Sequence, residues 1–507
     1  MEARPAISIV RWLPWLLGLT AAAILFIATQ PFGIGVTSDC VDYFSTAANL
    51  VRGEGFLQHD GNPYASWPPL YPMLLAAGLK VGLACETAAL LINMLSVALL
   101  LFFLSRWMLQ NLRHRFVAHW ASLVILLHFA LWDVALHAWT EPLFNLLAIL
   151  FLIQLPKTVK EDRWASLLGL ALLASTAWFL RYVGVTLVAT GGLFILFASS
   201  QSWPKRLSRA AVFGVIAATP TAIWMIRNLQ VMGQMAGERS PSAFGLVLNL
   251  RRMLKASWWI VPESWGKILP ALIFVALLVF LVITARRFRE QAKQLTLRKV
   301  LRVFSVLYLM LLLYTSTRFA FEAIHSRYLI PVFLPGLLWL TLWLDDYFAS
   351  LRLKTLRNVL AVLMVLWLIF PVLNTADQIA DARSEGIDAF GAPEWRDRPL
   401  WSWLEGGPED VILISNGADA LHYHTGLPVR LAPRKWMHSA GRTPTTELAD
   451  FASIFEEDRP VFCVWIADFP RTGARVNYHS LEELLELYRL EPIVAFPESA
   501  VFMVMPR

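Results

Sequence analysis

Charged residues are scarce in this chain of 507 residues. Asp, Glu, Lys and Arg together account for 16% of it, whereas 57% is hydrophobic and the mean hydropathy is +0.54. Soluble globular chains carry about 25% charged and about 45–50% apolar residues. The composition therefore excludes an ordinary soluble protein and indicates a membrane protein with many spans and room for one further domain.

Cysteine is also scarce, and the usual nucleotide-binding signatures are absent. Cys40, Cys85 and Cys463 form neither a CxxC pair nor a metal-ligand spacing. Buried free thiols are the simpler interpretation, and a Cys40–Cys85 disulfide is the alternative. The chain has no Gly-rich strand-to-helix turn and no Walker lysine. We therefore expect no nucleotide and no cofactor, while a divalent metal stays an open alternative.

Long apolar runs dominate the first three quarters of the chain. The first run has no small-residue cleavage site, so we expect a retained span rather than a removed signal peptide. A span needs about 20 predominantly apolar residues, and about eleven runs approach that length. They are 9–30, 86–108, 116–137, 140–155, 164–181, 183–199, 207–226, 268–285, 300–317, 328–345 and 356–374.

Basic residues occur in every second loop between these runs. They lie before the first run and near 106–115, 157–163, 205–209, 286–302 and 352–357. Basic loops stay on the cytoplasmic side, so the N-terminus is predicted to be cytoplasmic. The alternate loops and everything after about residue 374 are then outside. The net charge of +7 therefore reflects topology, and we expect no nucleic-acid partner.

The last part of the chain has only short apolar runs, at 411–414, 460–466, 492–496 and 501–505, with helical patterns between them. This alternation favours an α/β domain. The predicted fold class is an α-helical polytopic membrane protein with a C-terminal extracytoplasmic α/β domain. The membrane domain is predicted at 1–374, with an outer loop at 31–85, and the α/β domain at 375–507.

The outer loop carries unusual residues for a membrane exit. Asp39 and Asp42 directly follow the first run, and an amphipathic helix that includes them ends at Arg52-Gly53. The block Trp67-Pro68-Pro69-Leu70-Tyr71-Pro72 then precedes a second short apolar helix at 70–83. Acids, aromatics and prolines in such a loop are hard to explain by packing alone. We interpret the loop as part of the functional site of the protein.

Ionisable and aromatic side chains recur at the outer ends of the other runs. They are Asp133, His137, Glu141, Arg181, Tyr182, Arg227, Asn228, Arg318, Glu322, His325, Arg327 and Tyr328. Ionisable groups at a membrane boundary are expensive and often functional. A carboxylate can take a proton from an acceptor hydroxyl, and guanidinium groups can stabilise a leaving phosphate. The pattern therefore fits sugar transfer from a membrane-borne polyprenyl phosphate.

An ordered series of short motifs resembles the GT-C superfamily of membrane glycosyltransferases, in particular bacterial protein O-mannosyltransferase and lipid A aminoarabinose transferase-like members. The motifs are Asp39-Cys40-Val41-Asp42-Tyr43, Ala47-Ala48-Asn49-Leu50, Gly53-Glu54-Gly55-Phe56, Trp67-Pro68-Pro69-Leu70-Tyr71-Pro72, Thr140-Glu141-Pro142-Leu143-Phe144, Arg181-Tyr182-Val183-Gly184, Trp224 with Arg227-Asn228, and Arg327-Tyr328-Leu329-Ile330-Pro331. The resemblance implies an inverting glycosyltransferase of the bacterial inner membrane. It would move a sugar from undecaprenyl phosphate to a glycan, lipid or protein acceptor outside.

The resemblance also implies roles for single residues. Asp39 matches the acid that acts as the base, and Asp42 and Glu141 are the further catalytic candidates. The family's frequent paired-acid motif is not adjacent here, which argues against a metal-assisted variant. The candidates for phosphate or substrate binding are Arg181, Tyr182, Arg227, Arg327, Tyr328 and His325. Trp67 and Tyr71 are candidates for a sugar platform, with a rigid support for the loop as the favoured alternative.

Several of these residues have a plainer interpretation. Asp39 is well placed to be a helix N-cap, and Glu141 precedes a proline at a predicted helix start, where a carboxylate suits the dipole. Arg181 and Arg227 could reach the lipid headgroups. Arg327 could form a surface ion pair with Glu322, and Asp133 with His137 fits a structural pair.

Two other functions fit part of the pattern. A polymerase or ligase of lipid-linked glycans also works outside the membrane and uses basic loops. A non-enzymatic transporter of lipid-linked glycans is the second alternative. Transporter sites typically lie near the bilayer midplane, whereas the acids here gather at the rim. The sequence therefore favours transfer over transport.

Overall fold

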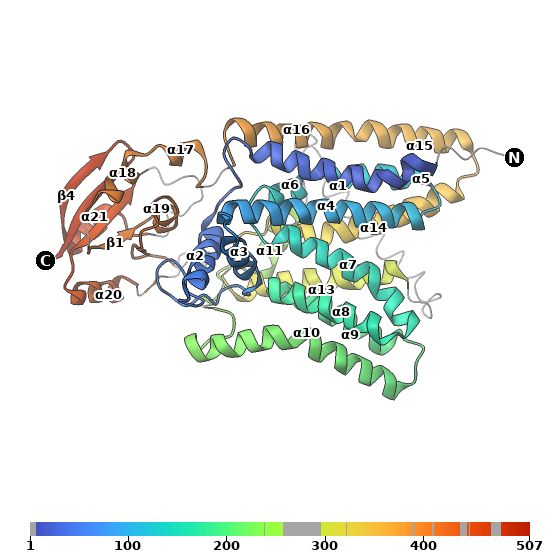
Figure 1. Cartoon of the computed structure of the whole chain (residues 1–507), viewed down its shortest axis with the longest axis horizontal. Coiled ribbons are helices and arrows are strands. Elements are labelled where there is room, and N and C mark those ends of the chain that lie inside the picture. Colours follow the sequence, from blue (N-terminus) through green and yellow to red (C-terminus); the bar gives the residue numbers. More distant parts are fainter. Residues whose placement is uncertain are drawn as a thin grey trace.

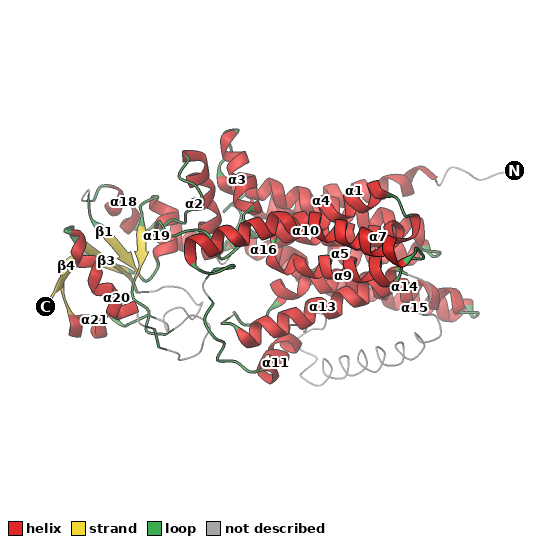
Figure 2. Ribbon diagram, turned by 90° about the horizontal axis from the view of Figure 1, so that it is seen from below, coloured by secondary structure: helices red, strands yellow, loops and turns green. Residues whose placement is uncertain are grey.

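The computed structural model describes residues 7–237, 239–256, 296–320, 322–387, 390–407, 410–436, 444–445, 447–467 and 478–507. It is a bundle of long, roughly parallel helices with a small sheet at one end (Figures 1 and 2). The predicted span at 268–285 and most of the basic loop at 286–302 lie outside the described residues.

The bundle is built from helices of very different lengths. They are α1 (Ile7–Thr29), α4 (Cys85–Asn111), α5 (Arg115–Leu126), α6 (Phe129–Ala135), α7 (Glu141–Glu161), α8 (Trp164–Leu180), α9 (Val185–Phe197), α10 (Trp203–Met232), α11 (Leu246–Ala256), α13 (Leu297–Arg318), α14 (Ser326–Ser350), α15 (Lys354–Trp367) and α16 (Ile369–Ser384). α1 packs on α4, and α8 packs between α7 and α10.

Seven helical segments among the described residues are long and apolar enough to cross a membrane: α1, α4, α7, α10, α13, α14 and the continuous pair α15–α16. α5 and α6, bent by 43° at their break, form an eighth if they are one span. α8 and α9 coincide with predicted spans but have only 17 and 13 residues. The chain is thus a multi-pass membrane protein, and the number of about eleven spans stays a prediction.

Two short helices cover the end of the bundle that faces the sheet (Figure 1). α2 (Ser38–Arg52) and α3 (Leu70–Lys80) match the two interfacial helices predicted in the outer loop. Gly53 ends α2 in the left-handed conformation, with φ of 82°, as the Arg52-Gly53 signal predicts. Burial of Tyr43, Phe44 and Ala47 fixes α2 against its neighbours.

The C-terminal region forms one mixed sheet of five strands in the order β2-β1-β3-β5-β4. β1 pairs in parallel with β2 and β3, whereas β5 runs antiparallel to β3 and β4. Its elements are α17 (Pro393–Arg396), α18 (Pro399–Glu405), β1 (Ile412–Ser415), α19 (Ala418–Thr425), β2 (Val429–Leu431), α20 (Glu447–Phe451), β3 (Val461–Ile466), α21 (Leu481–Leu487), β4 (Tyr488–Phe496) and β5 (Ser499–Pro506). The predicted division at residue 375 falls inside α16.

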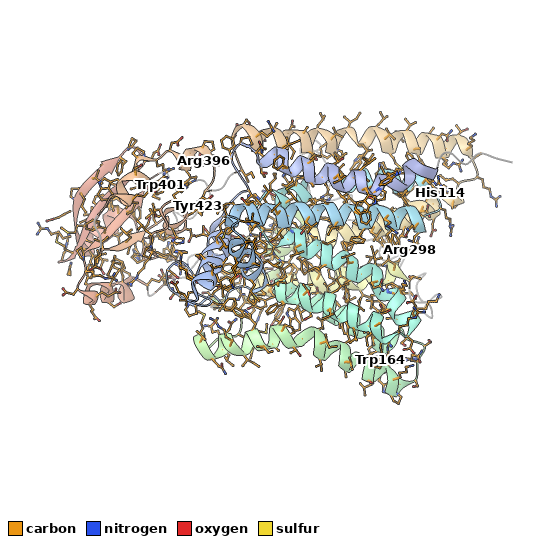
Figure 3. All side chains as sticks on the ribbon, viewed as in Figure 1. His114, Trp164, Arg298, Arg396, Trp401 and Tyr423 are labelled. Atoms are coloured by element: carbon orange, nitrogen blue, oxygen red, sulfur yellow. The ribbon has the colours of Figure 1, made fainter. Side chains whose placement is uncertain are left out.

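The two ends of the bundle differ in what they carry. Figure 3 shows Arg396, Trp401 and Tyr423 at the end that bears the sheet, and His114 and Arg298 toward the opposite end, where the N-terminus lies. The outer loop, through α2 and α3, lies at the sheet end (Figure 1). This arrangement places the candidate site between the helices and the sheet.

Candidate active site

A close backbone contact brings two distant segments together above the bundle. Gly35 donates its N–H to the Leu136 carbonyl at 2.8 Å and accepts from the N–H of Ala138 at 2.9 Å. A Cβ at Gly35 would lie 2.8 Å from the ring of His137, so only glycine fits. This contact positions the first turn of α2, with Asp39, beside the first turn of α7, with Glu141.

Arg327, at the start of α14, joins these two acids. Its Nη2 lies 2.7 Å from Oδ2 of Asp39, and its Nε lies 2.5 Å from Oε1 of Glu141. The two contacts use different nitrogens of one planar guanidinium, which fixes its orientation. Three residues that are far apart in the sequence therefore form one charged cluster.

Glu141 has a second arginine partner. Nη1 of Arg181, at the end of α8, lies 2.6 Å from the same Oε1 and donates to the Thr140 hydroxyl at 2.6 Å. The Thr140 hydroxyl in turn donates to Oε2 of Glu141 at 3.3 Å. Glu141 is thus the shared counter-ion of Arg181 and Arg327. Its position as the first residue of α7 also agrees with the helix-start interpretation.

Trp139 packs against the charged cluster. It was not among the candidate residues that the sequence indicated. The guanidinium carbon of Arg327 lies 3.9 Å from the centre of its ring, a cation–π distance. Its indole Nε1 donates to the Thr37 hydroxyl at 3.0 Å, and its ring stacks on His137 at 4.1 Å. The signal available in the sequence was its place directly before Thr140-Glu141.

Asp39 is the most accessible member of the cluster. Its side chain is 26% exposed, against 16% for Arg181, 7% for Arg327 and 0% for Glu141. Burial raises the pKa of Asp39, and the neighbouring charge of Arg327 only partly opposes the rise. The N-cap of α2 is Thr37, so Asp39 is a first-turn residue and not the cap. A carboxylate with a raised pKa is a better proton acceptor than an ordinary one.

Asp42 lies one turn further along α2 and is half-buried. Burial raises its pKa well above the usual range, and the negative charges of Asp419, Asp39 and Asp60 add to the rise. Asp42 therefore faces acids of the outer loop and of α19. Asp39 pairs with Arg327, whereas the largest charge effect on Asp42 comes from Asp419 in α19.

Tyr182, Arg227 and Asn228 hold the outer loop against the bundle. Arg227 donates to the Tyr64 carbonyl at 2.8 Å, and Tyr182 donates to the Ala65 carbonyl at 3.1 Å. Asn228 donates to the Tyr182 hydroxyl at 3.4 Å. Arg227 also lies 4.8 Å from the ring centre of Trp224. These contacts place all three beside residues 56–65 rather than beside Asp39.

Tyr328 and His325 form a separate rim group with Glu322. The Tyr328 hydroxyl donates to Glu322 at 2.8 Å, and His325 lies 3.7 Å from the same carboxylate. The interaction with His325 is the largest effect that lowers the pKa of Glu322 to about 2. The ion pairs of Arg327 run to Asp39 and Glu141, so its interpretation as a surface partner of Glu322 does not describe this structure.

The aromatic block and the remaining pairs have packing roles. Tyr71 is fully buried, with its ring 5.2 Å from Tyr43, and Trp67 packs 5.7 Å from the same ring. This arrangement favours the support role over a sugar platform. His137 bonds the backbone carbonyl of Asp133 at 2.8 Å. Cys40, Cys85 and Cys463 are free thiols, with Cys40 and Cys463 buried.

A cavity of about 570 Å³ lies between the outer loop and the sheet. Its lining is polar and mixed in charge, and includes Asn49, Arg52, Gln58, His59, His422 and Arg430. His59 bridges its two sides, because its Nε2 lies 3.0 Å from Oδ1 of Asp419 in α19. In the part of the chain that the structure describes, no three His, Cys, Asp or Glu side chains are grouped to hold a metal.

The chain resembles known proteins in its structure. No protein-family model and no curated protein matches the chain. ArnT from Cupriavidus metallidurans bound to undecaprenyl phosphate superposes with a TM-score of 0.59 at 12% identity, over 96% of this chain and 97% of that one. This chain has the GT-C fold. The predicted fold class, a polytopic α-helical protein with a C-terminal α/β region, is thereby confirmed, and the extracytoplasmic side of that region stays a prediction.

Two further GT-C structures agree. The oligosaccharyltransferase from Archaeoglobus fulgidus in its apo form gives a TM-score of 0.56 at 12% identity, over 97% of this chain and 74% of that one. The mycobacterial arabinofuranosyltransferase AftD gives 0.54 at 13% identity, over 98% of this chain and 42% of that one. At such identities the likeness concerns the fold, and the chemistry has to be argued from the residues.

Proposed function

We propose that the protein transfers a sugar from a polyprenyl-phosphate donor to an acceptor outside the membrane, with inversion. The observation that carries the proposal is the cluster in which Arg327 links Asp39 to Glu141. The GT-C fold supports it, since one neighbour, ArnT, is known with undecaprenyl phosphate bound. The fold and the cluster together favour a glycosyltransferase over a transporter.

In the proposed reaction, Asp39 takes the proton from an acceptor hydroxyl while that oxygen attacks the anomeric carbon of the sugar. The bond between this carbon and the phosphate oxygen breaks, and the electron pair leaves on the phosphate. Arg327 and Arg181 stabilise the developing negative charge, each by about 2.7–4 kcal/mol if they act like oxyanion donors. The proton ends on Asp39, whose raised pKa favours its acceptance.

Glu141 has a positioning role in this scheme. It is fully buried, and one of its oxygens already contacts both arginines. A buried carboxylate with two guanidinium partners is poorly placed to accept a proton from substrate. We infer that Glu141 keeps the guanidinium groups of Arg181 and Arg327 away from bulk water and oriented to bind a phosphate.

The acceptor is proposed to approach from the sheet side. The cavity between the outer loop and the sheet is lined on one side by Ser45, Asn49 and Arg52, which continue the face of α2 that begins at Asp42. Its volume lies in the range of small-molecule sites, and its mixed donors and acceptors suit a hydroxyl-rich glycan. Asp42 would then contact the acceptor rather than the donor.

The proposed topology has the N-terminus in the cytoplasm of a bacterium and the sheet outside its inner membrane.

The test is replacement of Asp39 in cells that lack the gene. We expect Asp39→Asn to reach normal membrane levels but to lower transfer by about 10²–10⁴, the usual contribution of a general base. Mass spectrometry of polyprenyl-linked sugars and surface glycans would then show an accumulated donor and a lost modification. Asp381→Asn, at an exposed carboxylate of α16, is the matched control and should restore both. Full restoration by Asp39→Asn at normal levels would refute the assignment.

A further inference from the structure

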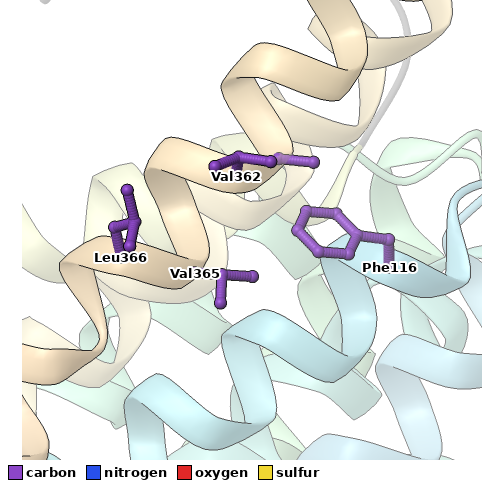
Figure 4. A pocket seen from close by; sticks show the side chains of 5 residues that line it. Phe116, Val362, Val365 and Leu366 are labelled. Carbon is purple, nitrogen blue, oxygen red and sulfur yellow. The ribbon is translucent and has the colours of Figure 1, made fainter.

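An apolar groove opens on the surface of the bundle between α5 and α15. Its volume is about 240 Å³, and the described residues that line it are Phe116, Ala361, Val362, Val365 and Leu366. Figure 4 shows Val362, Val365 and Leu366 along α15 on one side of the groove and Phe116 on the other. Trp120 ties the two helices together beside the groove, since its Nε1 donates to the Met364 carbonyl at 2.9 Å. The groove therefore has fixed walls.

The groove faces the lipid. α15 has no buried residue, and the side chains of Val362, Val365 and Leu366 are all more than half exposed. In a multi-pass membrane protein such a surface meets acyl chains rather than water. A flexible hydrocarbon chain is the occupant whose chemistry fits a lining without polar side chains.

Cations surround one end of the groove. Arg115 directly precedes Phe116, and Arg357 lies one helical turn before Ala361 on the same face of α15. Arg352 and Lys354 lie just before and at the start of α15. Among the described residues, none of these four side chains has a carboxylate within ion-pair distance, whereas the nearby Arg298 is paired with Asp346 at 2.6 Å.

The same end of the groove also presents backbone donors. α5 and α15 both begin there, with 12 and 14 residues. At α5 the Asp345 carboxylate already accepts from the N–H groups of Arg113 and His114, at 3.1 and 2.8 Å, whereas at α15 Leu353 gives the helix no side-chain cap. The first N–H groups of a helix attract anions. The start of α15 therefore reinforces the side-chain cations at the headgroup end of the groove.

We propose that the groove is a binding site for an anionic phospholipid. One acyl chain lies along Phe116, Ala361 and Val365, and the phosphate lies between Arg115 and Arg357. The lipid belongs to the leaflet on the side away from the sheet, where the basic loops gather. It replaces protein packing for α15, a helix that buries none of its own residues.

The experiment measures lipid binding to the purified full-length protein by native mass spectrometry. Phosphatidylglycerol and phosphatidylcholine with identical chains are titrated separately. We expect phosphatidylglycerol to bind more tightly, and Arg115→Gln/Arg357→Gln to weaken it about 30-fold, from about 1 kcal/mol per cation. Arg106→Gln/Lys160→Gln, which removes two exposed cations from other helices, is the matched control and should bind as the wild type does.

A third variant tests the groove itself. Ala361→Phe fills it without changing charge and should lower the affinity for phosphatidylglycerol. Equal affinity for the two lipids, or unchanged binding by Arg115→Gln/Arg357→Gln, would overturn the proposal. Tighter binding of a polyprenyl phosphate than of phosphatidylglycerol, lost in the same variant, would overturn the phospholipid as occupant.

Discussion

At the scale of single residues, the site depends on how one guanidinium is shared. Arg327 contacts the accessible Asp39 and the fully buried Glu141, and its face lies against Trp139. Two carboxylates and two arginines, counting Arg181, leave the cluster electrically balanced without substrate. Balance matters because an unpaired buried charge is far more costly than a paired one. The two acids of this cluster should therefore respond differently to neutralisation.

Glu141→Gln is predicted to destabilise the protein strongly. It leaves Arg181 and Arg327 without their shared counter-ion in a buried setting, and breaking a buried pair costs about 3–5 kcal/mol. Asp39→Asn should cost much less, because the Asp39 side chain is 26% exposed. Thermal unfolding of the detergent-purified variants measures the difference. Glu161→Gln, at the other end of α7, is the control, and a Glu141→Gln protein as stable as that control would contradict the structural role.

At the scale of elements, the outer loop is held from both sides. Arg227 and Tyr182 bind its backbone from the bundle, and the Gly35 contact fixes its start. His59 binds it to α19 through Asp419. The loop that carries Asp39 is thus positioned by the helices and by the sheet region together.

The contact between His59 and Asp419 is predicted to be pH-dependent. Burial alone would lower the pKa of His59, but the hydrogen bond and charge of Asp419 outweigh it and raise the pKa above 6.5. The protonated pair is thus complete below pH 6.5 and weakens as the pH rises through the raised value. Burial alone would raise the pKa of Asp419, but the hydrogen bond from His59 outweighs it and lowers that pKa below 3.8. Protonation of Asp419 therefore breaks the pair only in strong acid.

Hydrogen exchange in α19 and residues 54–61, corrected for intrinsic rates, measures this dependence. Between pH 6 and pH 8.5 the wild type should lose protection, and His59→Gln should be unprotected at both values. His479→Gln, which removes a histidine paired with Glu483 elsewhere in the sheet region, is the control. The same pH response in wild type and His59→Gln would refute the pH dependence of the His59–Asp419 contact. His422, stacked 5.0 Å from His59, has a pKa lowered mainly by burial, so its own titration lies below that of His59.

At the scale of the whole molecule, the outer loop and the sheet lie at one end, and the start of α15 beside the apolar groove lies at the other (Figure 1). Such a division suits a protein whose two ends face different compartments. The basic loops predict the orientation, with those loops on the cytoplasmic side.

Thiol labelling in intact cells checks this orientation. In a Cys85→Ser background, Glu405→Cys should react with an impermeant thiol reagent, because its exposed position belongs to the sheet end. Ser350→Cys, exposed at the opposite end of α14, should react only after permeabilisation. The reverse pattern would invert the topology and place the proposed active site in the cytoplasm.

The sequence by itself determined the membrane character, most helix positions, the two short outer helices and the concentration of ionisable residues at one rim. These follow from hydrophobic length, local capping signals and the cost of charge in lipid, all of which act over a few neighbouring residues. Only the tertiary structure decided the partners. Arg327 and Glu141 are 186 positions apart, and Trp139 and Gly35 matter only because two chain segments meet. Long-range packing creates those contacts, so no local pattern contains them.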